Sequence, residues 1–115
     1  VPEVVATLGN IPTTEYATPS TQEGADVIRA YIRAHDAVML QRHGSVTVGK
    51  TLRGAYHNLE KLEHTAQVLL TARQLGHVQP LSPKEIAKLA ALREDLGLGP
   101  GADVYRACGV TELPP

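Results

Sequence analysis

A long stretch of helical periodicity, residues 51–75, constrains the fold of this 115-residue chain more than any other feature. Apolar side chains recur there at spacings of three and four, which places them on one face of a helix. Thr51 can cap the first turn, and Gly76 can end the last. The sequence therefore predicts a helix over 52–75 with the apolar face Leu52, Ala55, Leu59, Leu62, Ala66 and Leu69.

Two shorter helices each begin with a capping box, a Ser and a Glu three residues later whose side chains satisfy each other's backbone donors. The two boxes are Ser20–Glu23 and Ser82–Glu85, and Pro83 occupies the first helical position of the second. These signals predict helices over 21–34 and 83–93.

Short apolar runs predict three strands, over 3–7, 37–42 and 45–49. The second and third strands are close enough in sequence to pair as a hairpin, or the chain can bend at Gly44, and the sequence does not decide between these arrangements. Residues 97–115 are rich in Pro and Gly with few periodic apolar positions, so they are interpreted as a C-terminal loop or tail.

Composition narrows the class of protein. With 11 basic and 12 acidic residues the chain has no basic stripe, so neither nucleic acid nor an anionic membrane is an expected partner. No apolar run approaches the roughly 18 residues of a membrane-spanning helix. The single cysteine, Cys108, excludes an internal disulfide and indicates a reducing, cytoplasmic compartment. The chain begins at Val1 in mid-pattern, and we expect it to be a piece of a longer protein or a processed product.

His43 is the first candidate for chemistry. It follows a predicted strand and precedes a glycine, so its imidazole would be presented at a strand end, where α/β proteins usually build their sites. The alternative is a histidine that is packed or hydrogen-bonded at the edge of the core, and local context favours this alternative.

A second candidate group lies on the long helix. His57, Glu60 and His64 share one helical face, and such a set can bind zinc or iron. A solvated face with helix-spaced ion pairs explains the pattern better, because Lys61 lies among them and no further ligands are obvious. Cys108 has no histidine at a recognisable spacing and is interpreted as a non-catalytic thiol.

The run from His35 to Lys50, with its order of apolar strand, His43-Gly44 and second apolar strand, resembles a signature of the class II aldolase/adducin family. The helix that follows carries Glu and Ala in the same register. Upstream, Gly9-Asn10-Ile11-Pro12 and the loop from Tyr16 to Thr21 resemble the segments that precede the signature. The resemblance covers about residues 3–94.

This resemblance implies an α/β fold, in which a mostly antiparallel sheet is covered by helices and this chain, residues 1–115, is the C-terminal part of a single domain. It implies a lyase or epimerase of carbohydrate metabolism that acts on a small sugar phosphate or related hydroxy-carbonyl compound through a metal-stabilised enediolate. Three histidines of the family hold a zinc or similar divalent ion, and His43 corresponds to the third. The family's cyclic tetramers imply a homotetramer, in which the 51–75 helix and the Tyr16 loop would be used in self-association.

The chain also departs from the family pattern. It lacks the His-x-His pair that supplies the other two ligands, so it can supply only one of three. In the aldolase branch a tyrosine stands just before the Gly-Asn-Ile-Pro segment, where this chain has Glu3. Aldolase chemistry is therefore in doubt, while epimerase, dehydratase and decarboxylase chemistry stay open. The alternative function is a non-catalytic interaction module, similar to the adducin head, that has lost its metal.

Overall fold

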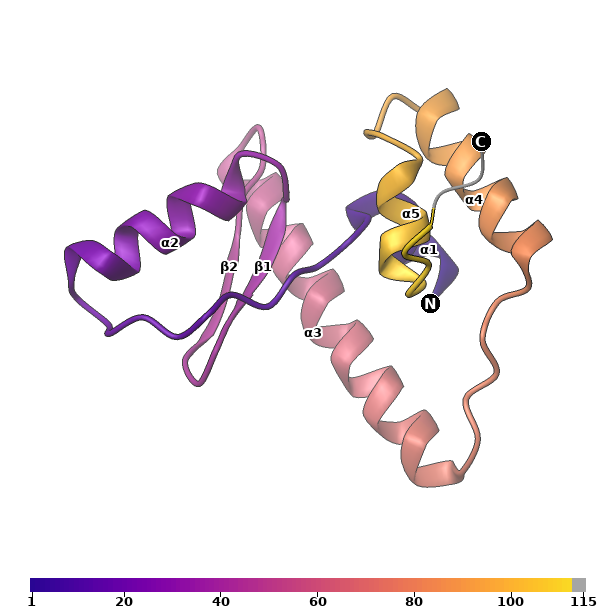
Figure 1. The fold of residues 1–115 in the computed structure, drawn as a ribbon, viewed down its shortest axis with the longest axis horizontal. Coiled ribbons are helices and arrows are strands. Elements are labelled where there is room, and N and C mark those ends of the chain that lie inside the picture. The colour runs from indigo at the N-terminus through magenta and orange to yellow at the C-terminus, as the bar shows by residue number, and fades with distance from the viewer. Residues whose placement is uncertain (113–115) are drawn as a thin grey trace. The chain divides into compact units, whose positions relative to one another are not determined.

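The computed structural model describes residues 1–112, which form helices and one small sheet (Figure 1). The chain divides into two compact units. One unit is Ile11–Leu62, and the other combines Val1–Asn10 with the chain from Glu63 onward. Because the long helix crosses the boundary, its first part belongs to one unit and its second part to the other.

The sheet of the Ile11–Leu62 unit is a hairpin. Strands β1 (Ala37–Leu40) and β2 (Gly44–Thr47) are antiparallel, and Leu40 is paired with Gly44. The hairpin, rather than a bend at Gly44, is therefore the arrangement that this sequence adopts, and both strands are shorter than expected.

A third extended segment runs beside β1 in the parallel direction. The amide of Thr14 donates to the carbonyl of Met39 at 2.9 Å, and the amide of Met39 donates to the carbonyl of Pro12 at 2.8 Å. Thr13 is bridged to Met39 in the same ladder. The segment that follows Pro12 and the turn that follows β1 therefore lie at the same end of the sheet, because parallel neighbours end together.

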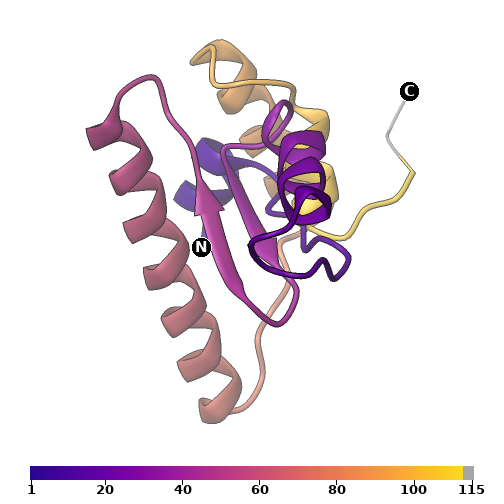
Figure 2. The ribbon, with the colours of Figure 1, turned by 90° about the vertical axis from the view of Figure 1, so that its left-hand side faces the viewer.

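Helix α2 (Gln22–Ile32) packs on β1, and the first part of the long helix lies on the other side of the hairpin (Figure 2). The N-cap of α2 is Thr21, whose hydroxyl oxygen accepts a hydrogen bond from the amide of Gly24 at 3.2 Å. The expected Ser20–Glu23 capping box is therefore wrong by one residue. Ser20 has a φ of 62° and belongs to the turn that enters the helix.

The long helix α3 (Leu52–Leu75) has the predicted bounds. Thr51 caps it by accepting from the amide of Gly54 at 3.0 Å, and Gly76 ends it with a φ of 132°. Its predicted apolar face is only partly covered by the described residues, because Leu62 is buried while Leu52 remains 88% exposed. The apolar periodicity therefore predicts the helix correctly, but it does not predict which residues cover the apolar face.

Tight contacts join the start of α3 to the end of β2. Asn58 donates to the carbonyl of Val48 at 2.8 Å, and the Thr47 hydroxyl donates to the carbonyl of Ala55 at 2.9 Å. A Cβ atom at Gly49 would lie 2.6 Å from the Ala55 amide nitrogen, so only glycine fits this approach. These contacts fix the hairpin against the helix within one unit.

The second unit contains three short helices, two of which correct the sequence analysis. Helix α1 (Pro2–Leu8) replaces the strand expected over 3–7. Helix α5 (Ala102–Ala107) lies within 97–115, which was expected to be a loop or tail. Residues 113–115 of that expected tail lie outside the described residues.

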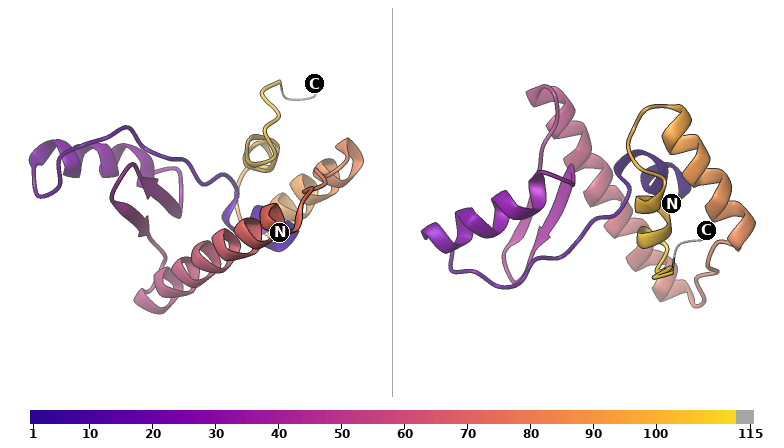
Figure 3. Two further views of the ribbon diagram at one scale, coloured as in Figure 1. Left: turned by 90° about the horizontal axis from the view of Figure 1, so that it is seen from below. Right: turned by 45° about the horizontal axis from the view of Figure 1, so that its top comes forward.

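Helix α4 (Pro83–Asp95) begins with the capping box that the sequence predicts. The Ser82 amide donates to the Glu85 carboxylate at 2.7 Å, and this contact lowers the pKa of Glu85. Val104 of α5 is fully buried against Ile86 and Ala90 of α4, forming the core of this unit. The right-hand view of Figure 3 shows α4, in orange, beside α5, in yellow.

Candidate functional site

His43 lies in the three-residue turn between β1 and β2. Its amide donates to the carbonyl of Leu40 at 3.1 Å, and Arg42 before it has a φ of 58°, in the left-handed region. The His43 side chain is exposed. Within residues 1–112 its imidazole has no hydrogen bond to another side chain or to the backbone. The local-context alternative, a histidine tied into the core, therefore does not describe this side chain.

A cavity of about 260 Å³ lies beside His43. It is bounded by the turn after β1, by the segment after Pro12 and by α2, all of which belong to the same compact unit. Most of its wall is apolar or hydroxylic. The lining residues are Thr14, Glu15, Ala17, Pro19, Ser20, Thr21, Gly24, Ala25, Val27, Ile28, Leu40, Gln41 and His43.

Glu15 is the second ionisable residue in this wall, and sequence reasoning missed it. Its carboxylate accepts a hydrogen bond from the Tyr31 hydroxyl of α2 at 2.9 Å. The Glu15 backbone amide, and then this hydroxyl, hold the pKa of the carboxyl below its ordinary value. The same contact raises the pKa of Tyr31. Glu15 is therefore an ionised acceptor in the cavity that His43 borders.

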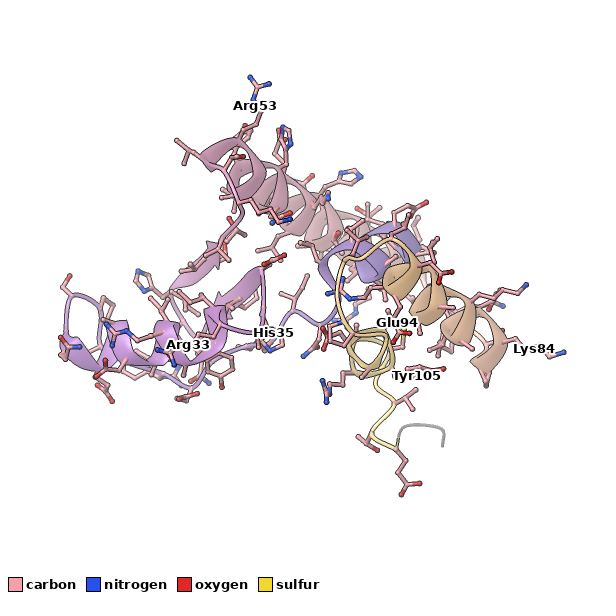
Figure 4. All side chains as sticks on the ribbon, turned by 90° about the horizontal axis from the view of Figure 1, so that it is seen from above. Arg33, His35, Arg53, Lys84, Glu94 and Tyr105 are labelled. Carbon is pink, nitrogen blue, oxygen red and sulfur yellow. The ribbon has the colours of Figure 1, made fainter. Side chains whose placement is uncertain are left out.

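The charges of the cavity wall are few. No lysine or arginine among the described residues lines it, and Glu15 and His43 are the ionisable side chains of its described wall. Positively charged residues elsewhere, such as Arg33, Arg53 and Lys84, are exposed on the helix surfaces of Figure 4. A polyanionic group such as a phosphate would find no fixed cation in this cavity and would face a carboxylate.

A divalent metal fits this site only in part. An exposed imidazole without a hydrogen-bond partner is a suitable zinc ligand, and a structural or catalytic zinc needs at least three protein ligands. Residues 1–112 contain no group of three His, Cys, Asp or Glu side chains that could hold a metal ion. His43 can therefore be one ligand of a metal centre, and the described residues do not complete it.

The other sequence candidates are Glu3 and the group on α3. His57, Glu60 and His64 are exposed on α3, and they form no metal-binding group among the described residues. Glu3 lies in the first turn of α1, where its carbonyl accepts from the Thr7 hydroxyl at 2.8 Å.

Cys108 follows α5 and packs against the core formed by α4 and α5. Burial raises the pKa of its thiol, which lowers the fraction of reactive thiolate at neutral pH. This environment agrees with the interpretation of Cys108 as a non-catalytic thiol.

The chain belongs to the class II aldolase and adducin family, because the family model for the "Class II Aldolase and Adducin N-terminal domain" matches residues 2–70. The matched region includes the His43 turn and the cavity wall. The resemblance stated from the sequence is thus confirmed, and helices with a small antiparallel sheet agree with an α/β fold. No solved structure matches the chain significantly.

Curated relatives give the family a chemical context. The 3-oxo-tetronate 4-phosphate decarboxylase of Escherichia coli is 33% identical over 90 residues, covering 76% of this chain and 41% of the relative. The enzyme of the same name from Pectobacterium atrosepticum is 32% identical over 91 residues, covering 77% of this chain and 40% of the relative. A 4-hydroxy-3-prenylphenylpyruvate oxygenase/4-hydroxy-3-prenylbenzoate synthase from Streptomyces roseochromogenus is 39% identical over 62 residues, or 54% of this chain and 22% of the relative.

The chain thus spans about two fifths of the length of the decarboxylases that it matches. Within the part of the chain that the structure describes, no helix is both long and apolar enough to cross a bilayer.

Proposed function

We propose that this chain is the C-terminal part of one class II aldolase-like domain, in a metal-dependent enzyme that acts on a small phosphorylated hydroxy-carbonyl compound. One observation carries the proposal. The imidazole of His43, which the sequence resemblance aligns with a family metal ligand, is exposed at the edge of a cavity that Glu15 also lines, and it has no hydrogen bond within residues 1–112. In the complete domain, a mostly antiparallel sheet covered by helices would continue the hairpin described here.

His43 would hold one coordination position of a divalent ion, zinc in our proposal, and the remaining ligands would come from outside this sequence. When bound, such an ion supplies a Lewis acid for adjacent substrate oxygens. The contribution of this chain is to hold the imidazole in place. Its turn is fixed by the pairing of Leu40 with Gly44 and by the hydrogen bond from the His43 amide to Leu40.

Among the reactions left open, decarboxylation of a 3-oxo acid phosphate has the most support. The decarboxylases named above are similar over three quarters of this chain. Glu3 replaces the tyrosine of the aldolase branch, which disfavours aldol cleavage. In 3-oxo-tetronate 4-phosphate the bond between carbons 1 and 2 breaks, and carbon 1 leaves as carbon dioxide. The electron pair passes to the carbonyl oxygen on carbon 3, carbon 2 then takes up a proton from water, and dihydroxyacetone phosphate results.

The complete protein, loaded with a divalent metal, should release one carbon dioxide for each dihydroxyacetone phosphate formed from 3-oxo-tetronate 4-phosphate. The measurement is a coupled assay of both products. An epimerase or an aldolase would instead act on a pentulose or deoxyhexulose phosphate without gas release. A protein with neither turnover nor bound metal would support the alternative, a non-catalytic module similar to the adducin head.

We also propose that the complete protein is a homotetramer in the cytoplasm and that α3 and the Tyr16 loop contribute to its subunit contacts. Tyr16 is 50% exposed and Leu70 of α3 is 60% exposed, and exposed apolar surface of this kind favours association. Sedimentation velocity should show a species larger than the monomer. A monomer that persists across a wide concentration range would contradict this assembly.

A further inference from the structure

The loop that carries Glu15 is anchored by the residue that precedes it. Thr14 is buried, its amide is bonded to Met39 of the sheet, and its hydroxyl donates to the carbonyl of Glu15 at 2.8 Å. The Glu15 side chain is held separately by the Tyr31 hydroxyl at 2.9 Å. Tyr31 belongs to α2 and is not among the residues that line the cavity, so its hydroxyl holds the carboxylate without forming part of the cavity wall.

This arrangement gives the cavity a fixed hydrogen-bond acceptor with negative charge. Hydroxyl groups donate to such an acceptor, and hydrogen bonds to charged partners are stronger than those between neutral groups. A phosphate dianion cannot donate to it and would be repelled, since none of the described residues of the wall is a lysine or arginine that could compensate the charge. The cavity therefore suits the hydroxylated part of a substrate and not its phosphate.

We propose that Glu15, positioned by Tyr31, accepts a hydrogen bond from a substrate hydroxyl in the cavity beside His43, and that the substrate phosphate is bound outside this cavity. The inference rests on the proposed function and deepens it, because it assigns the end of the substrate that faces His43. Glu15 is a substrate-binding residue in this proposal, and Tyr31 is a positioning residue.

The test compares two ligands that differ by one hydroxyl. Dihydroxyacetone phosphate and hydroxyacetone phosphate are titrated calorimetrically into the complete metal-loaded protein, with inorganic phosphate as a third ligand. The wild-type protein should bind dihydroxyacetone phosphate about tenfold or more tightly than hydroxyacetone phosphate, because the missing hydroxyl leaves the Glu15 acceptor unpaired. In Glu15→Ala this preference should fall about tenfold, while the affinity for inorganic phosphate should stay unchanged.

Two further variants complete the experiment. Glu23→Ala removes an exposed carboxylate of α2 that does not line the cavity, and it should keep the wild-type preference. Tyr31→Phe keeps Glu15 but removes the hydrogen bond that holds its carboxylate, so it should lower the preference for dihydroxyacetone phosphate several-fold. This variant still tests the inference if Glu15→Ala does not fold.

Several results would overturn the inference. The first is that the wild-type protein binds both ketone phosphates equally or binds neither. The second is that the preference for dihydroxyacetone phosphate survives in both Glu15→Ala and Tyr31→Phe. The third is that Glu15→Ala gains a large affinity for inorganic phosphate. If the proposed function is wrong and the inference about Glu15 is right, the wild-type protein keeps its preference for dihydroxyacetone phosphate but releases no carbon dioxide. The two failures are therefore distinguished by separate measurements.

Discussion

Replacement of His43 by Ala in the complete protein should remove most of the bound metal and lower turnover by more than about a hundredfold. Loss of a residue that only orients a metal ligand already costs about tenfold to a hundredfold, and loss of a ligand should cost more. The fold should remain, because the His43 side chain is exposed and the one hydrogen bond that ties His43 to Leu40 comes from its backbone amide. We expect the free energy of unfolding to change by no more than about 0.5 kcal/mol.

The matched control is His64→Ala. His64 is also an exposed histidine, and it lies on α3 with Glu60, the alternative metal-binding pair of the sequence analysis. This variant should keep its metal and its turnover. Elemental analysis of both purified variants, together with circular dichroism to verify folding, separates the two sites. A folded His43→Ala protein with its full complement of metal would show that His43 is not a ligand.

The sequence predicted the elements that have strong local signals. Helix α3 has apolar side chains at helical spacing from Leu52 to Leu69, and α4 has a complete capping box with Pro83 at its first position. The strand expected over 3–7 was wrong because Val4-Val5-Ala6 is too short to distinguish a strand from a helix by periodicity. In the structure Val4 and Leu8 lie four residues apart on the buried side of α1.

Helix α5 had no comparable local signal. It has only six residues, and a helix of that length is stabilised by packing rather than by propensity. The contact that stabilises it is the packing of the buried Val104 against α4, a separate segment of the sequence. A Pro- and Gly-rich stretch around such a helix is easily taken for a tail.

The candidate site likewise contains one residue with a local sequence signal and one without. The place of His43 in a turn could be predicted because a strand, a His-Gly pair and a second strand are contiguous, and its role as a metal ligand stays a prediction from the family resemblance. Glu15 could not, because its place in the cavity depends on the parallel bridge between Thr13 and Met39 and on the Tyr31 hydroxyl. The polar run Thr13-Thr14-Glu15 was the available signal, and without the bridge it is ordinary loop sequence. Gly44 remains unexplained by the described residues, since an added Cβ there would meet nothing within 4 Å.

The largest stability effect in this chain is expected at Arg93. Its guanidinium is buried, donates to the carbonyls of Ala6 and Thr7 at 2.9 Å, and lies 3.5 Å from the Asp103 carboxylate. It thereby satisfies the last turn of α1 and joins it to α4 and α5. Gly9 belongs to the same cluster, because a Cβ there would come within 3.1 Å of the guanidinium.

Arg93→Met keeps the aliphatic stem but removes every one of these hydrogen bonds and leaves a buried carboxylate with one partner fewer. Breaking a buried pair from one side costs about 3–5 kcal/mol, so we expect the free energy of unfolding to fall by about that amount.

Arg106→Met is the matched control, since Arg106 also pairs with Asp103, at 3.2 Å, but its side chain is 56% exposed. An exposed pair contributes about 0–1 kcal/mol. Urea unfolding followed by helical circular dichroism measures both variants, and equal losses in the two would show that the buried contacts of Arg93 do not hold this unit together.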